Sequence, residues 1–589
     1  MIRLEGVVSA APPGRGDARV LVGPVDLVVA PGTSHLLLGR NGSGKTSLMR
    51  ILAGLAEPTA GRFHLGDQDV RVGPEGRSLW PGVAALFEEP DPQFLSDCVE
   101  AEIAFGLESL DISPTEVRER VALAVHEFGL ESIAQRAPQS LSAGEKARTL
   151  LAAALAGRPG CLLLDQSLAH LDVGSRRELE GRVVREAVAH GRAVVRTHQE
   201  SDPPFPGETL HVLAAGSLRA VSQLTPRAVI EDSGVPYPLA LRVSALLAME
   251  GRWPGPLVAG VEQLERALEA DAFPSGPEAR SAPAAGSGGP GMRGGADSPP
   301  TARLAQAGRR GPAALAMRGV AWGPARSDAA PVLSGLDLEV ARGEIVALIG
   351  RSGSGKTTAL KLAAGLIEPT AGTIHRDRPS VPRVRPVALA LEYPERQLFG
   401  RTVLEDVAAL LWVEGIPAGE RVRSARRAMA EMGLDPDRFA ERFPPSLSEG
   451  EKRRAALAGV LVEPPQILLL DEPTAGLDPE GRRALGDVLR ALRERGRAVL
   501  LASHDLAFVA AIADRVVVLG RGGTSVLGEG NPVDVWRDHG LLDRAGIPEP
   551  DFVRLGRALH AAGLLAATPI RDEESLLESL ARGSAAARP

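Results

Sequence analysis

Two glycine loops in this sequence have the residue types and the spacing that bind phosphate. One begins at Gly39 and reads GRNGSGKTS, and the other begins at Gly350 and reads GRSGSGKTT. Small residues in this pattern let backbone N–H groups wrap a phosphate at a helix N-terminus, where lysine neutralises it and the next hydroxyl binds Mg²⁺. The expected binding residues are Gly39, Asn41, Gly42, Ser43, Gly44, Lys45, Thr46, Ser47, Gly350, Ser352, Gly353, Ser354, Gly355, Lys356, Thr357 and Thr358. Thr46 and Thr357 are the expected magnesium ligands among them.

An aspartate ends an apolar run further along each half of the sequence. Asp165 ends CLLLD and Asp471 ends ILLLD, and each would hold Mg²⁺ or its water. Glu472 follows the second aspartate and could orient or deprotonate an attacking water. The first half has Gln166 at this position, and an amide cannot accept the proton. Since loss of a general base typically slows a reaction by about 10²- to 10⁴-fold, the first site is expected to be degenerate.

The motifs recur in the same order, so the chain carries an internal repeat. LSAGEKAR begins at Leu141 and LSEGEKRR begins at Leu447. His198 and His504 follow the two aspartates at the same spacing, in RTHQE and ASHDL. Two homologous domains are therefore predicted.

The domain boundaries follow from the repeat and from a change in composition. A segment rich in Gly, Pro, Ala and Ser separates the two copies and has too few apolar residues to form a core. Such a flexible linker is long enough for the two halves to pack together as an intramolecular pseudo-dimer. The predicted parts are a first domain at 1–220, its helical extension at 221–273, the linker at 274–311, a second domain at 312–530 and its helical extension at 531–589.

The predicted local structure is an α/β arrangement in which strands lead into the glycine loops and helices follow them. Continuous apolar runs that end in an acid are expected to be buried parallel strands whose carboxyl ends line a ligand crevice. The predicted strands are His35–Leu38, Ile345–Ile349, Cys161–Leu164 and Ile467–Leu470, and the predicted helices are Thr46–Leu55 and Thr357–Leu366.

Composition excludes several classes of protein. With 589 residues and a net charge of −7, the chain is expected to be multidomain and has no overall basic character that would favour nucleic-acid binding. Its two cysteines, Cys98 and Cys161, are too few for a disulfide framework or a four-cysteine zinc site, which fits a reducing cytoplasm. No apolar run approaches the roughly 18 to 20 residues of a membrane span, so we expect neither a secreted nor a membrane-spanning protein.

Together, LSEGE, LLLDEPTAGLD and SHD resemble the ATP-binding cassette ATPases, and the chain resembles two such cassettes fused. The resemblance implies two P-loop NTPase domains, each with a helical signature subdomain and a small C-terminal helical extension. It implies ATP and Mg²⁺ as cofactors. It also implies that the signature loop of one cassette completes the nucleotide site of the other.

The implied sites are composite, and the histidines would sense or polarise the γ-phosphate. The first site would combine Lys45, Thr46, Asp165, Gln166 and His198 with Ser448 and Gly450. The second would combine Lys356, Thr357, Asp471, Glu472 and His504 with Ser142 and Gly144. Only the second site has its catalytic acid.

The sequence departs from the family pattern at several points. The loop that follows the acid reads PTAGLD in the second half but SLAHLD in the first, which supports a degenerate first half. The family's glutamine that reaches magnesium and couples to the membrane partner aligns with Glu88 and Glu392, so both are candidate magnesium ligands. Trp322 lies near the position of the family's adenine-stacking aromatic, and a packing role is equally open.

The segments LFEEPDPQF and LEYPERQLF resemble those of energy-coupling factor importers, and each half ends in a similar helical tail, near Gly234 and Gly546. Such importers combine two ATPases with a transmembrane coupling subunit and a small membrane substrate-binding subunit. Their cargo is a vitamin, a vitamin precursor, or cobalt or nickel ions. By this resemblance the chain would lie peripherally on the cytoplasmic face of the cell membrane, with coupling helices beside Glu88–Phe94 and Glu392–Phe399.

A rival interpretation is a soluble tandem cassette ATPase that acts on ribosomes. That class is expected to have a long charged helical linker and intact catalytic acids in both halves, whereas this chain has a Gly/Pro-rich linker and Gln166. A DNA-repair or chromosome ATPase is disfavoured because zinc-spaced cysteines and long heptads are absent from the sequence. A non-catalytic regulatory binder is disfavoured by Glu472.

Overall fold

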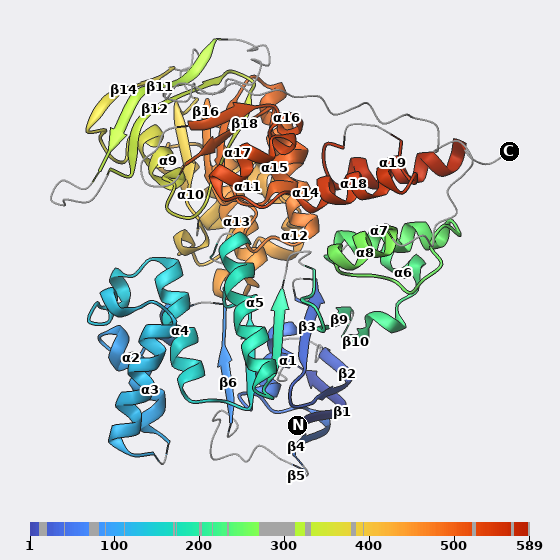
Figure 1. Cartoon of the computed structure of the whole chain (residues 1–589). Helices are drawn as coiled ribbons and strands as arrows, with labels where there is room; N and C mark the ends of the chain where they lie inside the picture. Colours follow the sequence, from blue (N-terminus) through green and yellow to red (C-terminus); the bar gives the residue numbers. More distant parts are fainter. Residues whose placement is uncertain are drawn as a thin grey trace, which may run out of the picture. The chain divides into compact units, whose positions relative to one another are not determined.

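The computed structural model describes residues 1–10, 20–40, 42–66, 68–69, 82–88, 90–110, 112–168, 171, 173–198, 203–214, 216–232, 235–269, 312–323, 331–377, 384–392, 394–520, 526–566 and 570–586. The chain forms two compact units, Met1–Ala245 and Leu246–Pro589 (Figure 1). The boundary falls within helix α7 (Leu239–Met249), inside the segment 221–273 that was predicted as the first extension. The predicted linker at 274–311 lies entirely outside the described residues.

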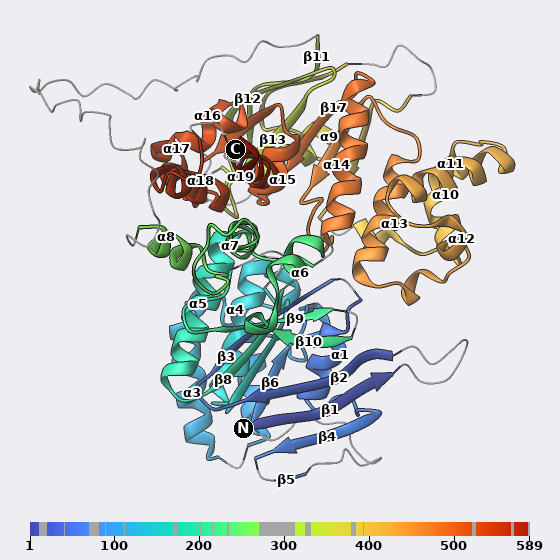
Figure 2. The ribbon, with the colours of Figure 1, turned by 90° about the vertical axis from the view of Figure 1, so that its right-hand side faces the viewer.

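The first unit contains two sheets. A six-stranded sheet has the order β10-β9-β3-β8-β7-β6, and all of its neighbours are parallel except β10 and β9. An antiparallel sheet has the order β2-β1-β4-β5 and forms a separate layer (Figure 2). The strands are β1 Ile2–Ala10, β2 Val20–Val29, β3 Ser34–Gly39, β4 Ala60–Leu65, β5 Gln68–Asp69, β6 Val83–Leu86, β7 Cys161–Asp165, β8 Ala193–His198, β9 Thr209–Ala214 and β10 Ser217–Ala220.

Helices of the first unit cover the six-stranded sheet, form a lateral lobe, or belong to the tail. Helix α1 follows the glycine loop, and α2, α3 and α4 pack together as the lobe. The helices are α1 Lys45–Leu52, α2 Val99–Glu108, α3 Pro114–Glu127, α4 Ala143–Ala156, α5 Val173–Ala189, α6 Pro226–Glu231 and α7, with 3₁₀ turns at Asp91–Gln93, Glu131–Ile133, Pro138–Ser140 and Val221–Gln223.

Alternate residues of β7 explain why this strand is apolar along its whole length. Leu162 and Leu164 pack into a core shared with the helical lobe and α5. Cys161 and Leu163 point to the opposite face and pack with α1 and the antiparallel sheet. A parallel strand that is buried on both faces needs apolar side chains at consecutive positions, and its terminal polar residue then marks the edge of the sheet.

The second unit repeats this architecture. Its sheets have the orders β15-β16-β17-β13-β18-β19 and β12-β11-β14, and β18 and β19 are the antiparallel neighbours within the larger sheet. The strands are β11 Ala313–Trp322, β12 Leu333–Ala341, β13 Ile345–Ile349, β14 Ala371–Arg376, β15 Val387–Ala390, β16 Ile467–Asp471, β17 Ala498–Ala502, β18 Arg515–Leu519 and β19 Val526–Gly530. The predicted α/β fold is thus present twice.

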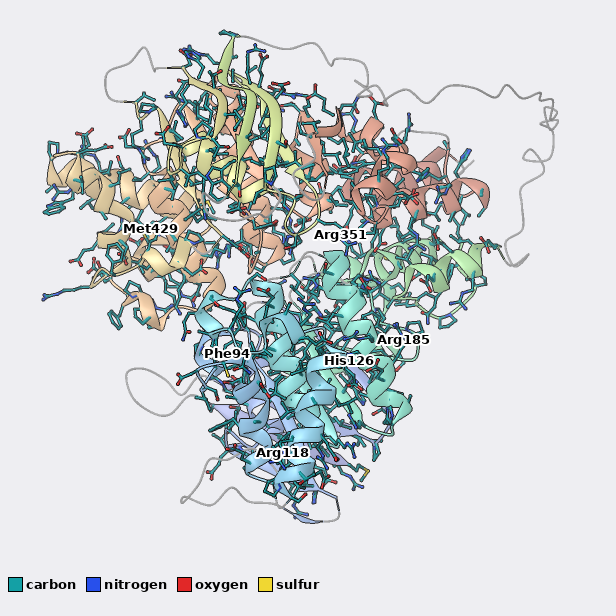
Figure 3. The ribbon with its side chains drawn as sticks, turned by 60° about the vertical axis from the view of Figure 1, so that its left-hand side comes forward. Phe94, Arg118, His126, Arg185, Arg351 and Met429 are labelled. Atoms are coloured by element: carbon teal, nitrogen blue, oxygen red, sulfur yellow. The ribbon has the colours of Figure 1, made fainter. Side chains whose placement is uncertain are left out.

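A second helical lobe, α10 to α13, and a C-terminal tail of four helices, α16 to α19, complete this unit. Figure 2 shows α10 to α13 grouped as one lobe, and Met429 of α11, labelled in Figure 3, is fully buried within it. The helices are α8 Val261–Glu269, α9 Lys356–Ala364, α10 Val403–Val413, α11 Ala418–Glu431, α12 Pro436–Phe439, α13 Glu449–Leu461, α14 Pro479–Glu494, α15 Leu506–Ile512, α16 Pro532–Arg537, α17 His539–Ala545, α18 Asp551–Ala561 and α19 Glu573–Ala586, with 3₁₀ turns at Pro394–Gln397 and Pro444–Ser446. None of the helices described is both long and apolar enough to cross a membrane.

The predicted strands agree with the observed ones to within one residue at each end, but the predicted helices were too long. Helix α9 ends at Ala364 because Gly365 adopts a left-handed conformation with φ of 79°. The N–H of Leu366 then bonds back to the carbonyl of Lys361, as in a Schellman motif. Helix α1 ends at Leu52 in a similar way, two residues before Gly54 with φ of 80°.

Candidate active sites

Each glycine loop connects a central strand to a helix at the carboxyl edge of the larger sheet. Gly44 and Gly355 cap helices α1 and α9 with φ values of 100° and 92°, a conformation that favours glycine. The Nζ atom of Lys45 lies 2.7 Å from the carbonyl oxygen of Gly39, and that of Lys356 lies 2.6 Å from the carbonyl oxygen of Gly350. Both lysines therefore fold back over their own loops.

The predicted loop residues come together as expected in the second unit, and in the first unit Asn41 alone lies outside the described residues. The hydroxyl groups of Ser43 and Ser354 are buried and have no hydrogen-bond partner within the described part of the chain. Each hydroxyl faces the first glycine of its loop, Gly39 or Gly350. Figure 3 labels Arg351, which follows Gly350 in the second loop. Unpaired hydroxyls, a lysine and open N–H groups at a helix N-terminus fit a bound phosphate chain.

Asp165 ends β7 and Asp471 ends β16. In each sheet, one strand separates this strand from the strand that leads into the glycine loop. Asp165 accepts a hydrogen bond of 2.6 Å from the hydroxyl of Thr197, and Asp471 accepts one from the hydroxyl of Thr357. Burial raises the pKa of the Asp471 carboxyl to about 6, and the charge of Glu472 acts in the same direction. A bound cation would remove this penalty, so the pair of Asp471 and Thr357 fits the predicted magnesium site.

Phosphate oxygens and water would complete such a site. Among the residues that the structure describes, no group of three His, Cys, Asp or Glu side chains is arranged to hold a metal. Mg²⁺ commonly binds one or two carboxylates together with substrate phosphates, which matches this donor set. Glu88 and Glu392 are half-buried and follow β6 and β15, the neighbours of the two aspartate strands, so they lie at the same sheet edge.

Glu472 is held by its backbone and by His504. Its φ of 47° lies in the left-handed region, and Gln166 has nearly the same value, 52°, so both halves keep this strained conformation. The Nδ1 atom of His504 lies 2.7 Å from Oε2 of Glu472. Burial acts to raise the pKa of Glu472, but His504 and Lys356 outweigh it, so the pKa is lowered. An ionised carboxylate at this edge can accept a proton from water.

The first unit pairs its histidine differently. Gln166 is 7% exposed, and the Nε2 atom of His198 lies 3.1 Å from Oε2 of Glu180, a residue of α5. Arg196 joins this carboxylate at 3.0 Å. Glu180 and Arg196 were missed by the sequence analysis, because a glutamate in a charged helix has no distinctive pattern. The arginine within the otherwise apolar run AVVRTH was the one available signal.

The signature motifs begin helices α4 and α13. Ser142 and Ser448 are the N-caps, and each forms a capping box with a glutamate three residues later. Gly144 and Gly450 lie in the first turns. A Cβ on Gly144 would lie 3.3 Å from the side chain of Leu171. These helix N-termini therefore present free N–H groups, which suit an anion.

The segments after β6 and β15 carry exposed apolar side chains on a rigid support. Glu102, which is buried, accepts hydrogen bonds from the N–H groups of Leu95 and Ser96 at 2.9 and 2.8 Å. Asp406 accepts equivalent bonds from Phe399 and Gly400 at 3.0 and 2.7 Å. Leu95 and Phe399 are nonetheless 69% and 82% exposed. Sequence analysis located these segments but missed the carboxylates that hold them.

Salt bridges connect these segments to the signature helices. Lys146 of α4 pairs with Asp91, and Arg453 of α13 lies 3.9 Å from Glu395. Phe94, labelled in Figure 3, is partly buried and packs against the core of the lobe. Trp322, the candidate adenine-stacking residue, is partly buried against the core of the second unit, and its stacking role stays a prediction.

Comparison with known proteins identifies the repeated domain. The sequence pattern of the ABC transporter family matches residues 22–169 and 333–475. A protein of Streptomyces coelicolor, provisionally named an ABC transporter ATP-binding protein, is 31% identical over 568 residues. The alignment spans 91% of this chain and 94% of that protein. The energy-coupling factor transporter ATP-binding protein EcfA2 of Clostridium perfringens is 36% identical over 259 residues, 42% of this chain and 90% of its own length.

One solved structure resembles nearly the whole chain. The model of ribosome-bound archaeal Pelota and ABCE1 aligns over 98% of this chain and 85% of its own, with a TM-score of 0.57 and 19% identity, which indicates a shared fold. The two family matches fall on the two units, and each contains a glycine loop and an aspartate at the sheet edge. The chain is therefore a member of the ABC transporter family with two ATP-binding cassettes in tandem.

Proposed function

We propose that this chain is the ATP-hydrolysing subunit of a membrane importer of the energy-coupling factor type. Its partners would be a transmembrane coupling subunit and a small membrane substrate-binding subunit. The cargo would be a vitamin, a vitamin precursor, or cobalt or nickel ions. The chain would lie on the cytoplasmic face of the membrane.

The observation that carries this proposal is the construction of the two segments after β6 and β15. Each starts at the sheet edge beside a candidate magnesium ligand and ends in an exposed apolar residue, Leu95 or Phe399, whose backbone N–H is bound by a carboxylate, that of buried Glu102 or of half-buried Asp406. A rigid apolar side chain next to a nucleotide site suits a helix of a membrane subunit, because burial of such side chains is worth about 1.5–3 kcal/mol each. The similarity to EcfA2 supports the same interpretation.

The catalytic cycle would depend on the difference between the two sites. Mg²⁺, when bound, would neutralise charge on the β- and γ-phosphates. Lys45 and Lys356 would hold phosphate oxygens, and Ser142 or Ser448 of the opposite half would close each site. Glu472 would then take a proton from the attacking water, while His504 keeps that carboxylate in place. The site of Gln166 would bind ATP without efficient hydrolysis.

Affinity purification of the tagged chain from gently solubilised membranes of its native host tests the proposal. Mass spectrometry is expected to find a multi-helix membrane protein and a small membrane protein in the purified material, with an untagged strain as the control. Recovery of ribosomes from the soluble fraction, without a membrane partner, would instead support a tandem cassette ATPase that acts on ribosomes.

A further inference from the structure

An arginine of the second signature helix contacts both the candidate catalytic glutamate and the segment after β15. Arg453 lies in the second turn of α13 and is 5% exposed. Its Nη2 atom donates a hydrogen bond of 2.6 Å to the backbone carbonyl oxygen of Glu472, and its Nη1 atom lies 3.9 Å from Oε2 of Glu395. Burial of a guanidinium is costly unless acceptors are close, so these two contacts define where the arginine can lie.

The carbonyl that accepts this bond belongs to a residue with a strained backbone. Glu472 has a φ of 47°, in the left-handed region that residues with a side chain seldom adopt. Its N–H donates a hydrogen bond of 2.9 Å to the carbonyl of Ala502, the last residue of β17. A Cβ on Gly476 would lie 3.9 Å from Cδ of Arg453, so the arginine also lies against the loop that follows Glu472. The peptide groups on both sides of Glu472 are therefore held, and with them the direction of its side chain.

Glu395 connects the arginine to the segment after β15. It lies in the 3₁₀ turn Pro394–Gln397, which packs against α13, and its side chain is 14% exposed. Phe399, four residues later, is the exposed side chain that would contact a membrane subunit. A displacement of this turn would change the charge and the packing around Arg453. A contact made at Phe399 can therefore reach Glu472 through two side chains.

The first unit has no donor at the corresponding position. The motifs LSAGEKAR and LSEGEKRR place Ala147 where the second unit has Arg453. Ala147 is buried in the core of the first lobe, and its methyl group cannot donate a hydrogen bond to Gln166. The acid of the first segment, Asp91, pairs instead with Lys146. Both units thus link the segment to the signature helix, but the side-chain bond to the residue after the strand aspartate depends on Arg453.

Arginine suits this position better than lysine. The planar guanidinium directs separate N–H groups toward a carbonyl and a carboxylate at the same time. An ammonium group would keep the positive charge near Glu395 but lacks this fork. Arg453→Lys is therefore a conservative variant that should keep only part of the function.

We propose that Arg453 is a positioning residue for Glu472, and that Glu395 connects it to the segment that would contact the membrane subunit. Arg453 affects hydrolysis through the backbone of Glu472, because it fixes the direction of the carboxylate that accepts the proton from water. The inference rests on the proposed role of Glu472 as the general base.

Steady-state ATPase assays of the purified full-length chain test the inference. Arg453→Met keeps most of the side-chain volume and removes both polar contacts. We expect kcat to fall by about 10- to 100-fold, because a small misplacement of a catalytic group has an effect of this size, while KM for ATP changes less than about twofold. Arg453→Lys should restore part of the loss. Glu395→Gln should lower kcat by about threefold and should have no further effect when it is combined with Arg453→Met.

Two further measurements separate positioning from a general structural role. In a Glu472→Gln background, Arg453→Met should cause no further loss of turnover, because a positioning residue acts through the carboxylate. Arg427→Met is the matched control. Arg427 belongs to the same lobe and also lies 3.9 Å from a glutamate, Glu431, but this pair is exposed. Its loss should leave kcat and KM unchanged.

Three results would overturn the inference: an unchanged kcat for Arg453→Met, an equal loss for Arg427→Met, or a further loss from Arg453→Met in the Glu472→Gln background. Arg453→Lys, which keeps the buried charge, provides the same comparisons if the methionine variant does not fold. Turnover at the wild-type rate by Glu472→Gln alone would contradict the proposed function and, with it, this inference.

Discussion

The Nδ1 atom of His504 lies 2.7 Å from Oε2 of Glu472 at the carboxyl edge of the second sheet, and the backbone N–H of His504 donates a further bond of 3.1 Å to the same carboxylate oxygen. The histidine thus fixes the carboxylate from two directions, next to Asp471. In the first unit His198 has Glu180 as its partner, which comes from a helix and not from the end of the strand. The two histidines are not equivalent in the sheets: Thr197 pairs with Asp165 and Ala502 pairs with Asp471, so His198 takes the strand position of Ser503.

If the nucleotide sites are composite, Ser142 serves the site of Glu472 although it belongs to the other half. We therefore expect Ser142→Ala to lower ATP turnover by about 10²-fold, the typical effect of removing one donor that stabilises transition-state charge. Ser448→Ala should have a much smaller effect on turnover, because it closes the site of Gln166. Steady-state ATPase assays of the two variants provide the comparison.

Ser113→Ala is the control for this experiment, because Ser113 is also an N-cap whose side chain accepts an N–H bond. Loss of that cap should cost about 1 kcal/mol of stability without slowing turnover. Equal turnover of the Ser142→Ala and Ser448→Ala variants would argue against composite sites of unequal competence.

The exposed side chains of Leu95 and Phe399 should be needed for membrane attachment. The double variant Leu95→Glu/Phe399→Glu is expected to lose copurification with its membrane partner, because it places charges in an apolar contact. Nucleotide binding should remain normal, which equilibrium dialysis can check. Leu123→Glu, at a 49% exposed position on α3, is the matched control. Retention of the partner by the double variant would show that these segments are not the contact.

A stacked histidine pair should make the first unit sensitive to acid. His35 Nδ1 lies 3.1 Å from His211 Nε2, and their ring centroids are 5.3 Å apart. Burial lowers the pKa of His35, and burial together with His35 lowers the pKa of His211 to about 4. The unfolded chain then binds more protons than the folded one, so stability is lost as pH falls from about 6.5 to about 4.

The second unit suggests the test, because Val346 and Val517 take the corresponding places in β13 and β18. His35→Val/His211→Val should reduce the loss of unfolding free energy between pH 7 and pH 4.5 by an amount on the order of 2 kcal/mol. Urea unfolding of the full chain at both pH values measures it. An identical pH dependence in the variant would mean that other groups account for the acid sensitivity.

Much of the fold was predictable because the motifs are local and occur twice. Apolar runs predicted the strands that end at Asp165 and Asp471, and the glycine loops predicted the helices that follow them. The helix ends were wrong because the stop signals, Gly54 and Gly365, were not used. Both glycines have the positive φ that ends a helix, and the sequence contained that information.

The parts of the site that escaped prediction depend on tertiary packing. Glu180 lies among charged residues of α5 that look like a solvated helix face, and only the folded unit shows that it is buried. Glu102 and Asp406 likewise look like surface acids near a helix start, although both bind backbone N–H groups of the preceding segment. Spacing identifies groups that share one motif, but not partners that come from separate elements.

The measurement that tests the central claim most directly is the ATPase rate of Glu472→Gln beside that of Gln166→Ala, each in the assembled complex. Removal of the carboxylate proposed as the general base should lower turnover by about 10²- to 10⁴-fold, while Gln166→Ala should be nearly neutral. Substantial residual turnover in the Glu472→Gln variant would contradict the claim that hydrolysis takes place at one of the two sites.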